Sequence, residues 1–143
     1  MDRQINKIVI HCTDSPDDRD LGFHEINEWH KLRFAGVEVN GEHIYCGYHF
    51  IIRRTGDVEI GRPEPVAGAH VAGHNWDSIG MVWVGKKAIA QEQYSALIHL
   101  CISLMSRYGL EPQNVLGHGE LFRGKTCPNL DMNRFRMELE KQI

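Results

Sequence analysis

Apolar residues follow two different spacing patterns along the chain, and each pattern predicts a different kind of element. Residues 5–13 read INKIVIHCT, a run rich in β-branched residues that stops at the turn-forming stretch DSPDD. This pattern predicts a strand buried on both faces. Residues 47–56 and 57–62 predict two strands of a hairpin that turns at Gly56, and further strands are predicted at 79–85 and 114–118.

Apolar residues at three- and four-residue spacing predict three helices. The clearest covers residues 91–108, with Gly109 as its C-cap, and its apolar stripe consists of Tyr94, Leu97, Ile98, Cys101, Met105 and Tyr108. Helices are also predicted at 23–34 and at 131–143, the latter with Asp131 as N-cap. Residues 35–46 predict a loop with a possible Asn-Gly hairpin turn, and residues 67–78 predict a surface loop. This order predicts an α/β fold, a single domain over 1–143 with a central mixed β-sheet flanked by helices.

Composition narrows the classes of function. The chain has 143 residues, 42% hydrophobic and 24% charged, which suits one compact domain. Its formal net charge is −3 and its basic residues are scattered, so no nucleic-acid partner is expected. The longest mostly apolar run, residues 97–105, is far shorter than the about 20 residues of a membrane span, so no membrane insertion is expected. The N-terminus lacks a signal-peptide pattern, which predicts a protein that is cytoplasmic when synthesised.

Two histidines are placed where an α/β sheet presents ligands. His11 lies at the carboxyl end of the first predicted strand, and His118 ends the strand predicted at 114–118. With Cys127 they would complete the three protein ligands of a catalytic zinc ion. Two structural histidines and a stray cysteine would give the same spacing, so this pattern leaves both interpretations open. No CxxC pair occurs, which argues against a structural zinc finger.

Five segments occur in an order that is typical of one enzyme family: IVIHCTDS, EINEWHK, GYHFIIRRTGDVEIGR, AGAHVAGHNWDSIG and GHGELFRGKTCPNLD. Together they make residues 5–131 resemble the zinc-dependent N-acetylmuramoyl-L-alanine amidases of the amidase-2 family. The likeness is strongest to phage-type lytic amidases, and the peptidoglycan recognition proteins are more distant relatives. The combination of GYHFII, a Gly hairpin and GKTCP is specific enough to favour the zinc interpretation.

The resemblance implies a role for each matching residue. His11, His118 and Cys127 would bind one zinc ion, and Tyr48 and Lys125 would act on the substrate. The expected reaction is hydrolysis of the amide bond between the lactyl group of N-acetylmuramic acid and L-alanine in peptidoglycan. Either Tyr48 or Glu120 would protonate the leaving amine. Three further residues match a stretch that lines the family's substrate groove: His70, Asn75 and Ser78. Asn and Ser in a Gly-rich loop are also common turn formers, so both interpretations stay open for Asn75 and Ser78.

The same residues are compatible with other functions. The chain could be a peptidoglycan-binding module without activity, although its retained Cys127 argues for an enzyme, or Cys127 could be a nucleophile paired with His118. A cytoplasmic amidase that recycles soluble muropeptides is a further alternative. A lytic enzyme without a signal peptide would need a separate membrane-permeabilising protein, which suggests a phage or prophage origin. A monomer is the expected state.

Overall fold

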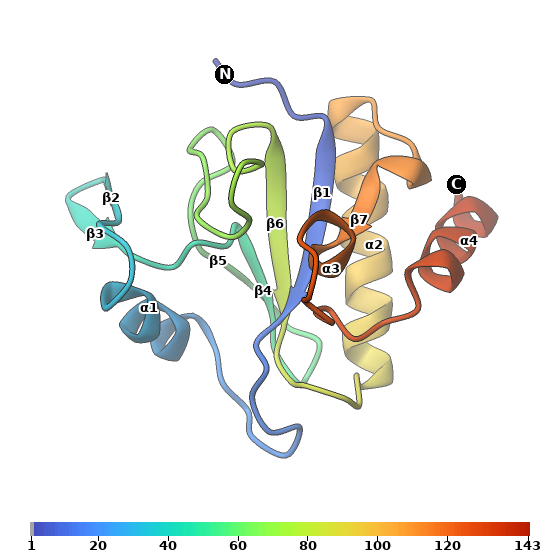
Figure 1. The fold of residues 1–143 in the computed structure, drawn as a ribbon, viewed down its shortest axis with the longest axis horizontal. Coiled ribbons are helices and arrows are strands. Elements are labelled where there is room, and N and C mark those ends of the chain that lie inside the picture. The colour runs from blue at the N-terminus through green and yellow to red at the C-terminus, as the bar shows by residue number, and fades with distance from the viewer. Residues whose placement is uncertain (1) are drawn as a thin grey trace.

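A five-stranded mixed sheet forms the centre of the molecule in a computed structural model that describes residues 2–143 (Figure 1). Its strand order is β5-β4-β6-β1-β7. Neighbouring strands are parallel except for β5, which runs antiparallel to β4. The strands are β1 (Lys7–Cys12), β4 (Phe50–Ile52), β5 (Val58–Ile60), β6 (Ser78–Trp83) and β7 (Val115–Gly117). The predicted α/β fold with a mixed sheet is confirmed.

Helices cover both faces of this sheet. The two longest, α2 (Gln91–Tyr108) and α4 (Met132–Gln142), lie against one face, and α1 (Phe23–Lys31) lies on the opposite side (Figure 1). A small hairpin of β2 (Val37–Val39) and β3 (Glu42–Ile44) extends beyond α1. The remaining short elements are the 3₁₀ helix η1 (Pro112–Asn114) and α3 (His118–Leu121).

The side chains of β1 alternate between the two sides of the sheet, one covered by α2 and α4 and the other by α1. Ile8, Ile10 and Cys12 belong to the larger apolar core, which is completed by α2 and α4. Because successive side chains of a strand point to opposite faces, His11 points toward the side of α1. The same alternation in β6 sends Met81 and Trp83 into the larger core and Val82 to the side of α1. A polar site can therefore form on the α1 side without interrupting the main core.

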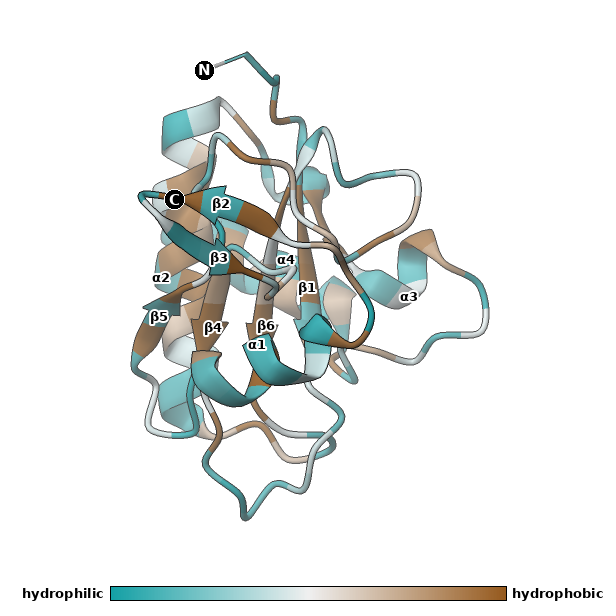
Figure 2. Ribbon diagram, turned by 90° about the vertical axis from the view of Figure 1, so that its left-hand side faces the viewer, coloured by the Kyte–Doolittle hydropathy of each residue, from teal (hydrophilic) through white to brown (hydrophobic). Residues whose placement is uncertain are grey.

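Hydropathy follows this layering, with apolar central strands behind a mostly polar α1 (Figure 2). The strands β1 and β6 are buried along almost their whole length. Within residues 2–143, none of the helices combines the length and apolar character that crossing a bilayer requires.

Most predicted boundaries agree with the structure to within a few residues. Helix α2 ends before Gly109, whose φ is 67°, and the Asp131 carboxylate accepts a hydrogen bond from the Arg134 N–H at the start of α4. Helix α1 stops at Lys31 rather than at residue 34, because the N–H groups of Leu32 and Arg33 bond to the carbonyls three residues earlier, as in a 3₁₀ turn. The possible Asn-Gly turn does form, with φ of 50° at Asn40 and 84° at Gly41.

Candidate metal centre and active site

The register between β1 and β7 brings two histidines together. Ile10 pairs with Gly117 across the parallel strands, so His11 and His118 are the next residues on each side at the carboxyl edge of the sheet. Their ring centroids lie 4.6 Å apart. His11 is supplied by a rigid buried strand, and His118 opens the short helix α3. Two residues that are far apart in sequence are thus held side by side by backbone pairing.

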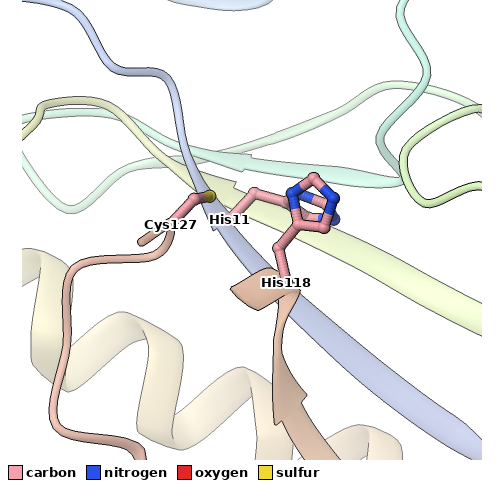
Figure 3. A group of neighbouring side chains, drawn as sticks. All are labelled: His11, His118 and Cys127. Carbon is pink, nitrogen blue, oxygen red and sulfur yellow. The ribbon is translucent and has the colours of Figure 1, made fainter. Parts of the chain in front are cut away.

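Cys127 reaches the same point from the loop between α3 and α4. Its sulfur accepts a hydrogen bond from the Cys12 N–H at 3.0 Å, and its carbonyl accepts one from the Gly119 N–H at 2.7 Å. The next residue is anchored as well, because the Trp83 indole N–H donates to the Pro128 carbonyl at 3.0 Å. The ligand atoms of His11, His118 and Cys127 all lie within 4.8 Å of one another (Figure 3).

Two glycines allow this loop to close. A Cβ atom on Gly117 would lie 2.7 Å from the Pro128 ring, and one on Gly119 would lie 2.3 Å from the Lys125 carbonyl oxygen. Both distances are shorter than real side chains tolerate. The glycines on either side of His118 therefore have a steric function, since they let the Cys127 loop pack directly on the backbone of the histidine ligand.

The electrostatics of the three side chains suit a divalent cation. Burial lowers the pKa of His11 well below its usual value, with further contributions from the imidazoles of His70 and His118. Burial also lowers the pKa of His118, and the Lys125 ammonium lowers it further. Contact with the Cys12 thiol, together with burial, raises the pKa of the Cys127 thiol. At neutral pH both imidazoles thus offer lone pairs, and a bound cation would draw the proton off the thiol.

A cavity of about 680 Å³ opens above these three residues. Tyr48 and Lys125 both line it, and the Tyr48 ring lies 5.0 Å from that of His11. Burial raises the pKa of Tyr48, so its hydroxyl keeps its proton at neutral pH. The structure therefore brings the five residues with expected metal or catalytic roles to one cavity.

Glu120 occupies a different position from the one that proton donation would need. Its carboxylate accepts a hydrogen bond from the Gly117 N–H at 2.9 Å and forms an ion pair with Arg136 at 2.8 Å. The hydrogen bond from Arg136 lowers the pKa of Glu120, which keeps the group ionised at neutral pH. Glu120 is not among the residues that line the cavity. Its contacts stabilise the start of α3 instead.

The three residues expected along the substrate groove divide into two groups. His70 and Asn75 line the cavity, but Ser78 is fully buried at the start of β6 and does not reach it. Ser78 therefore differs from the expectation that it contacts substrate. The His70 imidazole has a pKa well below its usual value because of burial, so it is neutral at pH 7. Its nitrogens lie 2.9 Å from His11 Nε2 and 3.2 Å from Ser78 Oγ.

Several cavity residues were not identified as site residues from the sequence. His30 is one of them: its Nδ1 accepts a hydrogen bond from the Gly47 N–H at 2.8 Å, and the residue also lines the cavity. Burial lowers its pKa to about 4. The helix predicted at 23–34 contains His30, Arg33 and Phe34, but its pattern did not mark them as site residues, and Phe122 follows directly after α3.

Comparison with known proteins agrees with this site. The family model for N-acetylmuramoyl-L-alanine amidase (Amidase_2) matches residues 1–130. The chain belongs to the N-acetylmuramoyl-L-alanine amidase family. The amidase is 33% identical over 136 residues to the endolysin of Escherichia phage T7, which covers 90% of this chain and 83% of the endolysin. It is 32% identical to the endolysin of Enterobacteria phage K11, with 93% and 86% covered.

Solved structures share the fold. The amidase superposes on the N-acetylmuramoyl-L-alanine amidase LysC from Clostridium intestinale with a TM-score of 0.80 and 29% identity, over 96% of this chain and 87% of LysC. It also resembles the Drosophila peptidoglycan recognition protein SD, with a TM-score of 0.71 and 22% identity over 90% and 76% of the two chains. The amidase is therefore an enzyme of peptidoglycan amide hydrolysis on a fold shared with recognition proteins.

The anchor of the Cys127 loop predicts the effect of one substitution. Trp83→Phe removes the indole donor and leaves the buried Pro128 carbonyl without its partner, which should lower the free energy of unfolding by about 1–3 kcal/mol. Denaturant unfolding measures the change. Trp76→Phe is the matched control, because Trp76 is 64% exposed, and it should change stability by less than about 0.5 kcal/mol. Equal effects of the two variants would contradict the anchoring role.

Proposed function

We propose that the amidase is a lytic, zinc-dependent enzyme whose single metal ion is held by His11, His118 and Cys127. Its substrate would be peptidoglycan, cut between the lactyl group of N-acetylmuramic acid and L-alanine. The observation that carries this proposal is the convergence of three ligand atoms within 4.8 Å of one another beside a cavity that also contains Tyr48 and Lys125. The lytic role is supported by the relatives from phages T7 and K11, which are endolysins.

The donor set favours zinc over the common hard cations. Two imidazole nitrogens and one thiolate suit a borderline-soft ion, whereas magnesium and calcium prefer oxygen ligands. Three protein ligands leave one position open, which is the arrangement of catalytic rather than structural zinc sites. When bound, zinc would lower the pKa of a water molecule to about 7, which supplies the nucleophile that a stable amide requires.

The remaining steps fall to side chains of the cavity. The Lys125 ammonium would stabilise the negative charge that develops on the carbonyl oxygen during attack. Tyr48 would donate its hydroxyl proton to the leaving amine of L-alanine, because burial keeps that hydroxyl protonated. Glu120 is the weaker candidate for this step, since its carboxylate is ionised and paired with Arg136. In this scheme the amidase is a metal hydrolase in which the Lys125 ammonium and one proton donor, Tyr48, would act beside the zinc ion.

The proposal predicts which products appear and what abolishes them. Incubation with purified sacculi should release free peptides that begin with L-alanine, and mass spectrometry identifies them. A chelator should stop the release, added zinc should restore it, and Cys127→Ser should lose both the zinc equivalent and the activity. Product release that resists the chelator but stops with a thiol-alkylating agent would point to a cysteine nucleophile. Binding to sacculi without products would indicate a recognition module.

The roles of Lys125 and Tyr48 predict kinetic defects without metal loss. Lys125→Met should lower kcat about 10²- to 10³-fold, because one stabilising donor is removed. Tyr48→Phe should lower kcat about 10²- to 10⁴-fold, because the proton donor is removed. Zinc content should stay unchanged in both variants. Lys141→Met, at an exposed position of α4, and Tyr45→Phe, outside the cavity, are the controls and should keep normal rates.

The ionisation of the ligands predicts proton release on zinc binding. The pKa values of His11 and His118 are lowered, so both are already neutral at pH 7, whereas the raised pKa of Cys127 keeps its thiol protonated. Zinc binding at pH 7 should therefore release about one proton, and affinity should rise with pH in this range. Calorimetry in two buffers of different ionisation enthalpy counts the protons. Release of no protons would show that the thiol is not a ligand.

A further inference from the structure

We propose that His70 is a positioning residue that works with Ser78 to set the tautomer of His11, so that Nδ1 of His11 faces the metal. This inference rests on the zinc site proposed above and extends it to the segment from His70 to Gly80. It assigns His70 and Ser78 to the support of a ligand rather than to contact with substrate.

The hydroxyl group of Ser78 determines which atom donates in each hydrogen bond between Ser78, His70 and His11. Ser78 Oγ lies 2.7 Å from the His74 carbonyl oxygen, which can only accept, so the single hydroxyl proton of Ser78 is used there. Ser78 Oγ must then accept the bond from His70 Nε2, at 3.2 Å. A neutral imidazole carries one N–H, so Nδ1 of His70 is left as an acceptor. The contact of 2.9 Å between His70 Nδ1 and His11 Nε2 is therefore donated by His11.

This chain of bonds decides which nitrogen of His11 can bind a metal. With its proton on Nε2 and engaged by His70, His11 has its only free lone pair on Nδ1. Histidine ligands of metals commonly donate their other ring N–H to an acceptor, which orients the ring and increases its basicity. The acceptor here is a second neutral imidazole, which is itself oriented by a hydroxyl group in β6.

The same bonds leave His70 without a free nitrogen for substrate. The imidazole lines the cavity, but Nδ1 is used by His11 and Nε2 by Ser78. A residue that recognises substrate through hydrogen bonds would need one of these atoms to be available. The position of His70 thus fits an indirect role better than a direct one.

The fold also provides a fitted slot for the His70 ring. A Cβ atom on Gly80 would lie 2.7 Å from the ring, and one on Gly68 would lie equally close to it, so glycine at both positions admits the imidazole. The backbone at its entrance is fixed by Asn75, whose Oδ1 accepts hydrogen bonds from the N–H groups of His70 and Val71 at 2.9 Å each. The position of His70 is therefore fixed at its backbone by Asn75 and at Nε2 of its ring by Ser78.

Two substitutions at the same position separate hydrogen bonding from packing. His70→Phe keeps a ring in the slot but offers no acceptor, whereas His70→Asn places an amide oxygen near the position of Nδ1. The first measurement is the His11 tautomer in the metal-free protein, from ¹⁵N chemical shifts of the imidazole. The second is zinc affinity, from competition with a chelator. His99→Phe, at an exposed position of α2, is the matched control.

In the wild-type protein and in His70→Asn, we expect His11 to carry its proton on Nε2 and to bind zinc with similar affinity. His70→Phe should give a mixture of His11 tautomers and about 10- to 100-fold weaker zinc binding. Ser78→Ala should also mix the tautomers, by freeing His70 to reverse its bond, and it reports the same effect if His70→Phe does not fold. His99→Phe should match the wild type.

Equal loss of affinity in His70→Asn and His70→Phe would overturn the proposal, because packing alone would then explain the effect. A wild-type His11 with its proton on Nδ1 would also overturn it. Absence of zinc binding by the wild type would instead refute the proposed metal site, while the tautomer in the metal-free protein would still test the relay.

Discussion

The active site depends on the parallel pairing of β1 with β7. This backbone register, in which Ile10 lies opposite Gly117, makes His11 and His118 the neighbouring residues at the edge of the sheet. Neither side chain needs to reach far, and the thiol of Cys127 is then delivered to the pair by a loop that only the flanking glycines allow to approach. Side-chain chemistry is thus built on main-chain hydrogen bonds, which tolerate changes elsewhere in the core as long as the strands keep their alignment.

Local patterns in the sequence were sufficient for most of the fold. The stripe of α2, its Gly109 cap, the Asp131 cap and the Asn-Gly turn all reflect interactions within a few residues, which is why they could be predicted. Features set by distant contacts were not predictable in this way. Ser78, assigned to a surface loop, is the buried first residue of β6, because its pairing with Lys7 of β1 places it inside the sheet.

The same contrast between local patterns and distant contacts applies to the site. Position at strand ends suggested His11 and His118, and zinc chemistry made Cys127 a candidate third ligand beside a purely structural interpretation. The family resemblance favoured the zinc set and added Tyr48 and Lys125, since no spacing rule links residues so far apart. Neither argument could show that His70 contacts His11 or that Glu120 is paired with Arg136. Both contacts join residues of separate elements. Burial also lowers the pKa of four imidazoles that line the cavity, so they are neutral at pH 7: those of His11, His30, His70 and His118. Because these imidazoles are neutral, they add no positive charge that would oppose a divalent cation bound by His11, His118 and Cys127.

The indole of Trp83 gives the molecule an internal optical probe. It is fully buried and bonded to the loop that carries Cys127, whereas Trp29 and Trp76 are 40% and 64% exposed. A small polar quencher in solution can therefore reach the two surface indoles and leaves the emission of Trp83 in place. The residual fluorescence after quenching belongs to a single side chain at the base of the loop, so opening of that loop can be followed without any attached label.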